Sequence, residues 1–308
     1  MSLYSLVAGK GPSGFGYGST AEAVSAGIDL TGKRFLVTGS NSGLGLETVR
    51  VLTLRGATVI ATARTEEKAK RATDGLAHAD RIIPLACELG DHHSVRAAAE
   101  AVRAMGEPLD GIITNAGIMA LPEREQIHGI EKQFFVNHIG HFILVTGLLE
   151  TLSPTGRIVS LSSSAHTGPV PGGIDLDNLS GERGYRSWPF YGQSKLANLL
   201  FARELSRRFE GTEQIACSVH PGVIATNLAR HQNRFILGVV KVLSPLVLKT
   251  IPQGAATQVW AAVSADPQTI DGKYLYDCNV QNSSRLGRDM DLAKRLWDRS
   301  EEIVARLP

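Results

Sequence analysis

Short apolar runs alternate along the chain with segments in which apolar residues recur at helical spacing. The apolar runs predict strands at 34–38, 58–62, 81–85, 111–114, 157–161, 215–220 and 273–276. The helical patterns cover 44–55, 66–77, 93–105, 131–149, 191–209 and 252–265. This alternation favours right-handed crossovers and a parallel sheet with helices on both faces. We therefore predict an α/β fold, a doubly wound Rossmann-type sheet that binds ligands at the carboxyl ends of its strands.

The length and composition of the chain suit one large domain. It has 308 residues, 43% of them hydrophobic, which is enough for a substantial core. We expect residues 1–30, rich in glycine at 9–18, to form an arm or partly ordered extension, and residues 31–308 to form the single Rossmann domain. No stretch reaches the roughly 18 uninterrupted apolar residues of a spanning helix. The apolar run 3–8 is too short for a signal-peptide core.

Charge, cysteine and histidine content exclude several classes of function. A formal net charge of +2 gives no basis for a nucleic-acid surface. The three cysteines stand far apart and lack metal-ligand spacing, so we expect no metal, a reducing compartment and a cytoplasmic protein. His138 and His141 are three residues apart, but no carboxylate or cysteine motif accompanies them. We interpret them as packed or solvated histidines.

A glycine-rich turn follows the first predicted strand. The segment Thr38–Gly45 has the spacing Gly-x3-Gly-x-Gly and precedes a helical pattern. A strand, a glycine turn and a helix N-terminus present backbone N–H groups and a favourable dipole to a pyrophosphate. An ordinary tight connection is the alternative. The candidate cofactor-binding residues of this turn are Gly39, Ser40, Asn41, Ser42, Gly43, Leu44 and Gly45.

The end of the second predicted strand distinguishes between the two nicotinamide cofactors. A carboxylate at this place accepts a hydrogen bond from the ribose 2′-hydroxyl of NAD, whereas an arginine accommodates the 2′-phosphate of NADP. Here Arg64 follows the strand, and no acidic residue occurs before Glu66. A guanidinium forms bidentate, charge-assisted hydrogen bonds with phosphate. We therefore predict NADP(H), with an ordinary surface arginine as the alternative.

Tyr191 and Lys195 are the pair of residues that most directly indicates chemistry. Among the six tyrosines, only Tyr191 has a lysine four positions later. Positions i and i+4 share one face of a helix, so the ammonium is expected beside the phenol. A nearby cation favours the phenolate and moves the pKa of the phenol toward neutrality. The pair then predicts a proton donor and acceptor that works near pH 7, although a solvated helix face has the same spacing.

Four motifs in order resemble those of the short-chain dehydrogenase/reductases. They are Thr38–Gly45, Asn115–Gly117, Ser162–Ser163 and Tyr191–Lys195, and the resemblance covers roughly residues 30–280. The chain looks most like the branch that contains retinol dehydrogenases, the WW-domain oxidoreductase and light-dependent protochlorophyllide reductases. Arg157–His166 and His220–Val223 are similar to segments of that branch.

This resemblance implies a catalytic group. In the family pattern Ser-Ser-x-Ala the second serine is catalytic, which selects Ser163 over Ser162 and Ser164. Tyr191 is then the acid and base, and Lys195 stabilises its phenolate and contacts the nicotinamide ribose. Asn137 matches the family's helix asparagine, which holds a water in a relay with the lysine; an asparagine without a role is the alternative.

The resemblance also implies further contacts with the cofactor. Glu88 and Leu89 stand where the family has an aspartate and an apolar residue near the adenine, and the longer acid leaves that contact open. A simple turn is the alternative for Pro221–Gly222. The remaining expected contacts, after the fourth and sixth strands, are Asn115, Ala116, Gly117, Pro221, Gly222, Val223 and Thr226.

Two variable segments are expected on the substrate side. Ser163 and Tyr191 are 28 positions apart, which implies a loop at 168–190 with aromatic walls at Tyr185, Trp188 and Phe190. Residues 226–253, strongly apolar at 235–248, correspond to the family's mobile lid. An apolar lid indicates a sizeable lipophilic substrate. The alternatives are a packed helix, a subunit interface and, ranked below the lid, contact with a lipid surface.

Together these features predict an NADP-dependent oxidoreductase for a small lipophilic carbonyl or alcohol. One alternative is reduction of a ring or conjugated double bond, although the related protochlorophyllide reductases rely on a cysteine that Cys217 and Cys278 do not match in position. Another is a sensor or scaffold that binds NADP without turnover. The sequence is compatible with a monomer or a homo-oligomer.

Overall fold

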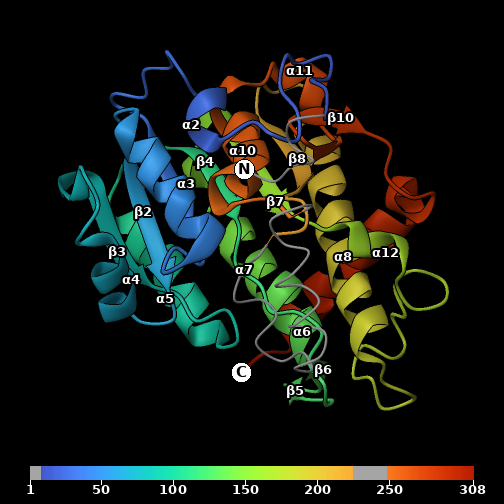
Figure 1. The fold of residues 1–308 in the computed structure, drawn as a ribbon. Helices are drawn as coiled ribbons and strands as arrows, with labels where there is room; N and C mark the ends of the chain where they lie inside the picture. The colour runs from blue at the N-terminus through green and yellow to red at the C-terminus, as the bar shows by residue number, and fades with distance from the viewer. Residues whose placement is uncertain (1–7, 225–247) are drawn as a thin grey trace.

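A single eight-stranded sheet organises the computed structural model, which describes residues 8–224 and 248–308 (Figure 1). Its order is β10-β9-β8-β7-β4-β1-β2-β3, and its strands are parallel except that β10 runs antiparallel to β9. The strands are β1 (Arg34–Val37), β2 (Thr58–Ala63), β3 (Ile82–Ala86), β4 (Leu109–Thr114), β7 (Leu152–Leu161), β8 (Ile215–His220), β9 (Tyr274–Tyr276) and β10 (Asn279–Gln281). A separate hairpin consists of β5 (Gln126–Ile127) and β6 (Ile130–Glu131). The predicted doubly wound α/β sheet is confirmed.

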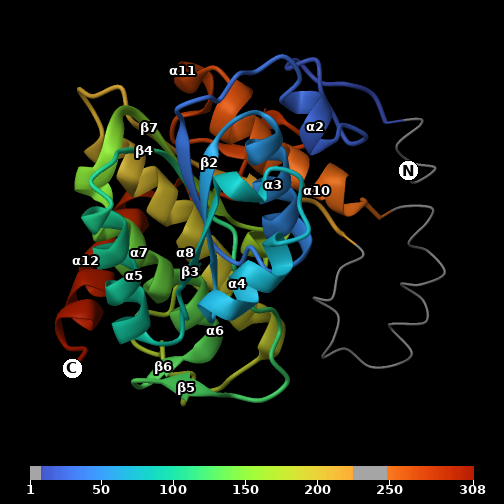
Figure 2. The same ribbon diagram turned by 90° about the vertical axis from the view of Figure 1, so that its left-hand side faces the viewer.

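Helices cover both faces of the sheet (Figure 2). One face carries α5 (His92–Ala104), α6 (Lys132–Phe134), α7 (Gly140–Thr146), α8 (Ser187–Arg208) and α12 (Met290–Ala305). The other carries α2 (Ala21–Val24), α3 (Gly43–Leu54) and α10 (Ile251–Val259). Shorter elements are α4 (Glu66–Thr73), α11 (Pro267–Ile270), 3-10 turns at Ala79–Arg81, Leu149–Thr151, Ser164–Thr167 and Leu286–Arg288, and π-helical turns at Phe135–Ile139 and Trp260–Ser264. Each face therefore has its own apolar core.

Every predicted strand and helix overlaps an observed element, but the bounds of several differ, and some observed elements were not predicted. The helix predicted over 131–149 is interrupted by the π-helical turn Phe135–Ile139, which periodicity alone does not reveal. The helix predicted from Tyr191 begins earlier, at Ser187. The short strand β10 and the long helix α12 were not predicted. The chain does carry a signal for α12, because Asp289 caps its N-terminus and its apolar residues recur at helical spacing.

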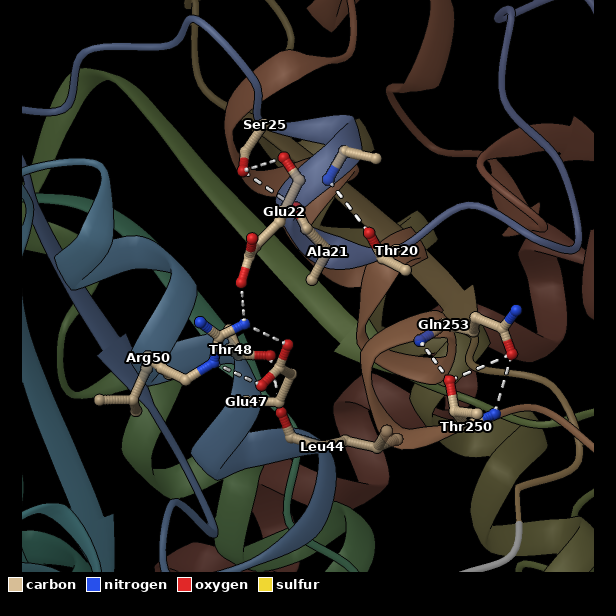
Figure 3. Close-up of polar contacts among 12 residues, drawn as sticks. Thr20, Ala21, Glu22, Ser25, Leu44, Glu47, Thr48, Arg50, Thr250 and Gln253 are labelled. Carbon is tan, nitrogen blue, oxygen red and sulfur yellow. Dashed lines mark hydrogen bonds and ion pairs between the residues drawn. The ribbon is translucent and has the colours of Figure 1, made fainter. Parts of the chain in front are cut away.

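Residues 8–30 pack against the domain (Figure 3). The short helix α2 begins at Thr20, whose hydroxyl caps the backbone N–H of Ala23 at 3.2 Å. Glu22 forms an ion pair with Arg50 of α3 at 2.6 Å. The same view shows the capping box of α10, in which the Thr250 and Gln253 side chains each bind the other's backbone N–H. The extension is thus joined to the first helix of the fold.

Cys87, Cys217 and Cys278 are free and buried. Burial raises the pKa of each thiol to about 12. Among the described residues, no helix is long and apolar enough to cross a bilayer. Most of the predicted apolar lid and Thr226 lie outside the described residues.

Candidate active site

The predicted site residues gather at one edge of the sheet because they follow neighbouring parallel strands. Thr38 follows β1, Asn115 follows β4, Ser162 follows β7 and Pro221 follows β8. Backbone hydrogen bonds continue past the strand ends, from Thr38 N–H to Ile113 O at 3.0 Å and from Ser162 N–H to Val219 O at 2.9 Å. The segments that follow these four strands therefore meet at the carboxyl ends of the sheet, where doubly wound sheets bind ligands.

The glycine turn is compact on its inner side. Gly39 has a φ of +69°, and a Cβ there would lie 2.9 Å from the Cβ of Ala116. Gly45 packs against the Gly39 carbonyl with no room for a side chain. The Asn115 side-chain amide donates to the Thr38 carbonyl at 2.8 Å, which joins the turn to β4. The absence of side chains is thus a packing requirement at Gly39 and Gly45.

The outer side of the turn is open at the N-terminus of α3. Gly43 has a φ of +58°, and no described atom lies within 4 Å of the position its Cβ would take. The Ser42 side chain makes no capping hydrogen bond to the described residues, so the first-turn N–H groups of α3 remain available to a ligand. These features fit an anion such as the pyrophosphate of a dinucleotide.

The neighbouring strand ends contribute one cation and one acid to this edge. Ser40 N–H donates to Thr62 O at 2.8 Å, so the glycine turn is bound to β2 two residues before the exposed Arg64. Glu88 accepts a hydrogen bond from Gly90 N–H at 3.2 Å within its own loop. Leu89 is buried in the core. Arg64 is therefore an exposed cationic group beside the predicted anion site, and it makes no ion pair with the residues that the structure describes.

Asn137 and Lys195 form the buried floor of the site. The Asn137 side chain is fully buried; its Oδ1 accepts from Ile118 N–H at 2.8 Å, and its Nδ2 donates to Ile118 O and Ser194 Oγ, both at 2.9 Å. Lys195 Nζ donates to Leu161 O at 3.1 Å. A Cβ on Gly117 would lie 3.1 Å from Asn137 Oδ1 and 3.4 Å from Lys195 Nζ. The three positions predicted from separate motifs are thus brought together.

Tyr191 and Ser163 carry the two candidate catalytic hydroxyls beside this floor. Ser163 is half-buried, whereas Ser162 is buried and donates its hydroxyl to Lys195 O at 2.7 Å, a bond with a structural role. Burial raises the pKa of Tyr191 to about 12, and a hydrogen bond with the Ser163 side chain acts in the opposite direction. Burial lowers the pKa of Lys195 to about 8.

The predicted shift of the Tyr191 pKa toward neutrality is therefore wrong for this structure. Lys195 Nζ lies 5.9 Å from the centroid of the Tyr191 ring and donates to a backbone carbonyl. Desolvation of the phenolate outweighs the attraction of a cation at that distance. The spacing of four residues places both side chains at the site, but it does not put the ammonium on the phenol.

Two buried histidines form hydrogen bonds that connect parts of the site. The sequence patterns did not indicate them as site residues. His141 Nδ1 donates to Asn137 O at 2.9 Å, and its Nε2 accepts from the Thr38 hydroxyl at 2.9 Å. His166 Nδ1 donates to Ser163 O at 2.6 Å, and its Nε2 accepts from Ser284 N–H at 3.1 Å. Burial lowers the pKa of both rings, so both remain neutral bridges. Of the two predicted alternatives, packed or solvated, the structure supports packed histidines, because His138 and His141 are buried. His141 also links the glycine turn to Asn137.

The aromatic residues of the predicted substrate loop differ in exposure. Trp188 is 51% exposed and lies edge-on to Tyr191 with ring centroids 6.1 Å apart. Phe190 is buried, and the Tyr185 hydroxyl donates to Leu121 O at 2.7 Å. Of these three aromatic residues, Trp188 therefore has the most exposed ring beside the site.

A doubly wound sheet whose glycine turn fits an anion, beside a buried lysine and tyrosine and a half-buried serine, is the architecture of a dinucleotide-binding α/β oxidoreductase. The family model described as short chain dehydrogenase matches residues 33–175. The chain is 42% identical over 321 residues to the short-chain dehydrogenase TIC 32 B, chloroplastic, of Brassica napus, covering 100% of both. It is 38% identical over 283 residues to retinol dehydrogenase 12 of Mus musculus, covering 90% of this chain and 88% of the relative. The chain belongs to the short-chain dehydrogenase/reductase family.

Solved structures agree with this assignment. An uncharacterized protein from Mycobacterium paratuberculosis superposes with a TM-score of 0.75 at 33% identity, covering 92% of this chain and 97% of that chain. A short chain dehydrogenase from Burkholderia cenocepacia, solved in complex with NADP, superposes with a TM-score of 0.64 at 25% identity, covering 80% of this chain and 96% of that chain.

Proposed function

We propose that this oxidoreductase uses NADP(H) to transfer a hydride between the nicotinamide and a lipophilic carbonyl or alcohol. The observation that carries the proposal is the meeting of Ser163, Tyr191 and Lys195 beside the anion-binding turn, with Asn137 beneath them. A proton donor, a cation and a dinucleotide site at one sheet edge are what carbonyl reduction requires.

The choice of NADP rests on Arg64. It is exposed at the end of β2, two residues after the strand is bound to the glycine turn. A guanidinium there is suited to a 2′-phosphate, and no acidic residue precedes Glu66 to repel it. The glycine turn would hold the pyrophosphate, and Asn115–Gly117 and Pro221–Val223 would line the nicotinamide. The Burkholderia cenocepacia structure in complex with NADP supports the same choice.

In the direction of reduction, Tyr191 donates the proton. With its pKa raised to about 12, the phenol keeps its proton at neutral pH and can pass it to the substrate oxygen as negative charge develops there. The Ser163 hydroxyl donates a second hydrogen bond to that oxygen. Lys195 stabilises the phenolate that remains, and Asn137 fixes Ile118 and Ser194 around it. When bound, NADPH supplies the hydride.

A lipophilic substrate is supported by two observations. Trp188 offers a half-exposed indole beside Tyr191, and one relative is named a retinol dehydrogenase. The alternative of double-bond reduction with a cysteine donor is not favoured, because Cys217 and Cys278 are fully buried.

A panel of aldehydes, ketones and secondary alcohols, assayed with NADPH and NADH or with their oxidised forms, tests the proposal. We expect turnover of apolar carbonyls with a preference for NADPH. A protein that binds NADPH but consumes none across the panel would instead be a sensor or scaffold. A preference for NADH would contradict the role of Arg64.

A further inference from the structure

A second buried lysine, Lys249, lies behind the proposed nicotinamide segment. Its side chain is 1% exposed, and its Nζ lies 2.5 Å from Asp277 Oδ1. The ammonium also faces the rings of Tyr17, at 5.0 Å, and Tyr276, at 5.5 Å. The His220 ring stacks on the Tyr276 ring, with ring centroids 4.9 Å apart. Burial of an ammonium is unfavourable unless an anion or aromatic rings compensate it, and Lys249 has both kinds of partner. We call Asp277, Tyr17 and Tyr276 together the enclosure of Lys249.

Lys249 determines where residues 222–224 lie. Its backbone N–H donates to Val223 O at 3.0 Å, and Ile224 pairs with it in a parallel bridge. Its alkyl chain packs on Gly222, where a Cβ would lie 2.8 Å from Lys249 Cδ. Gly222 has a φ of +90°, a conformation that side chains rarely adopt. The segment is therefore seated on both the backbone and the side chain of Lys249.

The carboxylate that pairs with Lys249 comes from a strained turn. Asp277 and Cys278 join β9 to β10 with φ values of +52° and +58°, and neither is glycine. Cys278 N–H donates to Thr257 Oγ1 of α10 at 3.2 Å, which holds the turn in place. Strain of this kind persists where the surroundings require it, and here the turn directs the Asp277 carboxylate at Lys249.

The N-terminal segment closes the enclosure. Its residues 8–18 run over the β9–β10 hairpin: Ser13 N–H donates to Asn279 Oδ1 at 3.0 Å, and Asn279 Nδ2 donates to Phe15 O at 3.1 Å. Gln253 Nε2 donates to Gly18 O at 3.4 Å. These bonds place Tyr17 over the ammonium of Lys249. Residues 8–18 and the β9–β10 hairpin thus meet around Lys249, the residue that packs on Gly222.

We infer that Lys249, Asp277 and Tyr17 act together as positioning residues for Pro221–Val223, so that the N-terminal segment contributes to cofactor affinity. The inference rests on the proposed function, which gives that segment a contact with the nicotinamide. None of the three residues belongs to the group that transfers the proton. Their loss should therefore weaken NADPH binding more than it slows turnover at saturating NADPH.

The test measures the Kd for NADPH, by titration calorimetry on the full chain, together with KM and kcat. Lys249→Met removes the charge and keeps the length, and we expect its Kd to rise at least about tenfold, the ratio given by about 1.4 kcal/mol. Lys33→Met is the matched control. Lys33 also forms an ion pair, with Asp110 at 3.0 Å, but its side chain is half exposed. It lies directly before β1, at the amino ends of the strands and away from the site. The Kd of this variant should stay at the wild-type value.

A second variant covers the case in which Lys249→Met does not fold. Tyr17→Leu keeps an apolar side chain but removes the aromatic face, and it should raise the Kd about threefold or more, with Tyr17→Phe closer to the wild type. A folded Lys249→Met or Tyr17→Leu protein that binds NADPH like the wild type, or one that loses kcat while the Kd is unchanged, would overturn the inference. A wild-type protein that binds neither NADPH nor NADH would contradict the proposed function instead.

Discussion

The two halves of the candidate site are built in opposite ways. The half that suits the cofactor phosphates, from Gly39 to Arg64, lies within one stretch of chain and faces outward: Asn41, Ser42 and Arg64 are exposed. The half that carries Ser163, Tyr191 and Lys195 is mostly buried, and its hydrogen bonds join residues as far apart as His166 and Ser284.

The difference follows from what each half must do. A polyanion brings its own charge, so its site needs accessible N–H groups and a cation, which a local turn can supply. Proton transfer needs side chains held in fixed positions away from bulk water, and elements distant in the sequence provide that burial for Tyr191 and Lys195. Variants in the first half should therefore change affinity for the cofactor, and variants in the second should change turnover.

The largest expected effect belongs to the buried half. Tyr191→Phe keeps the ring and removes the hydroxyl, so turnover should fall at least about 10²-fold, the usual scale for general acid catalysis. The Kd for NADPH should change little, because the glycine turn is untouched. Steady-state rates and a binding titration on the same preparation check this. Near-normal turnover would remove Tyr191 from the mechanism, and an equal loss of NADPH affinity would break the division between the halves.

Arg64→Ala should give the complementary result. The loss of charge-assisted hydrogen bonds to the 2′-phosphate should raise the Kd for NADPH about tenfold or more. Binding of NADH, which lacks that phosphate, and kcat at saturating NADPH should both stay near the wild-type values. The measurement is a pair of titrations with the two cofactors. Equal losses for NADPH and NADH would refute the assignment of Arg64.

A smaller effect on affinity is expected from Gly43→Ala. The residue has a φ of +58°, and the methyl group would enter the open space at the N-terminus of α3. That space is where the pyrophosphate is expected, so NADPH and NADH should both bind several-fold more weakly, while the left-handed conformation lowers the stability of the folded protein by about 1–2 kcal/mol. Unlike Arg64→Ala, this variant should not discriminate between them. Unchanged titrations with both cofactors would place the pyrophosphate elsewhere.

A separate prediction concerns the free energy of unfolding and isolates the contribution of Lys195. Burial lowers the pKa of Lys195 from 10.5 to about 8, so between these values the unfolded chain binds more protons than the folded one. Lys195 should therefore add to the free energy of unfolding as pH rises from 8 to 10.5, by at most about 1.4 kcal/mol per pH unit. Urea unfolding of the wild type and Lys195→Met at both ends of this window measures the difference.

The matched control for that comparison is Lys70→Met, which removes an exposed lysine of α4. It should keep the wild-type gain in stability across the window, whereas Lys195→Met should lose it. The same slope in all three proteins would show that Lys195 titrates in the folded state as it does in the unfolded chain.

The difference between the two halves of the site also explains which features could be predicted from the sequence. The glycine turn, Arg64 and the strands of the sheet depend on neighbours in the chain, and local patterns indicate them. Hydrogen bonds such as His141 to Thr38 depend on which elements meet, and no spacing encodes them. The π-helical turn around Asn137 adds one residue to a helix without changing its apolar character. For the same reason, the raised pKa of Tyr191 follows from burial and not from the lysine four residues later.

The three buried thiols can serve as probes of which part of this protein unfolds first. Cys87 follows β3 at one end of the sheet, Cys217 lies in β8, and Cys278 lies in the turn that carries the partner of Lys249. With pKa values near 12, they are inert toward alkylating reagents while they stay folded. A brief pulse of iodoacetamide followed by mass spectrometry would therefore mark which part of the molecule was open at that moment. Labelling of Cys278 before Cys217 would show that the hairpin detaches while the centre of the sheet is still intact.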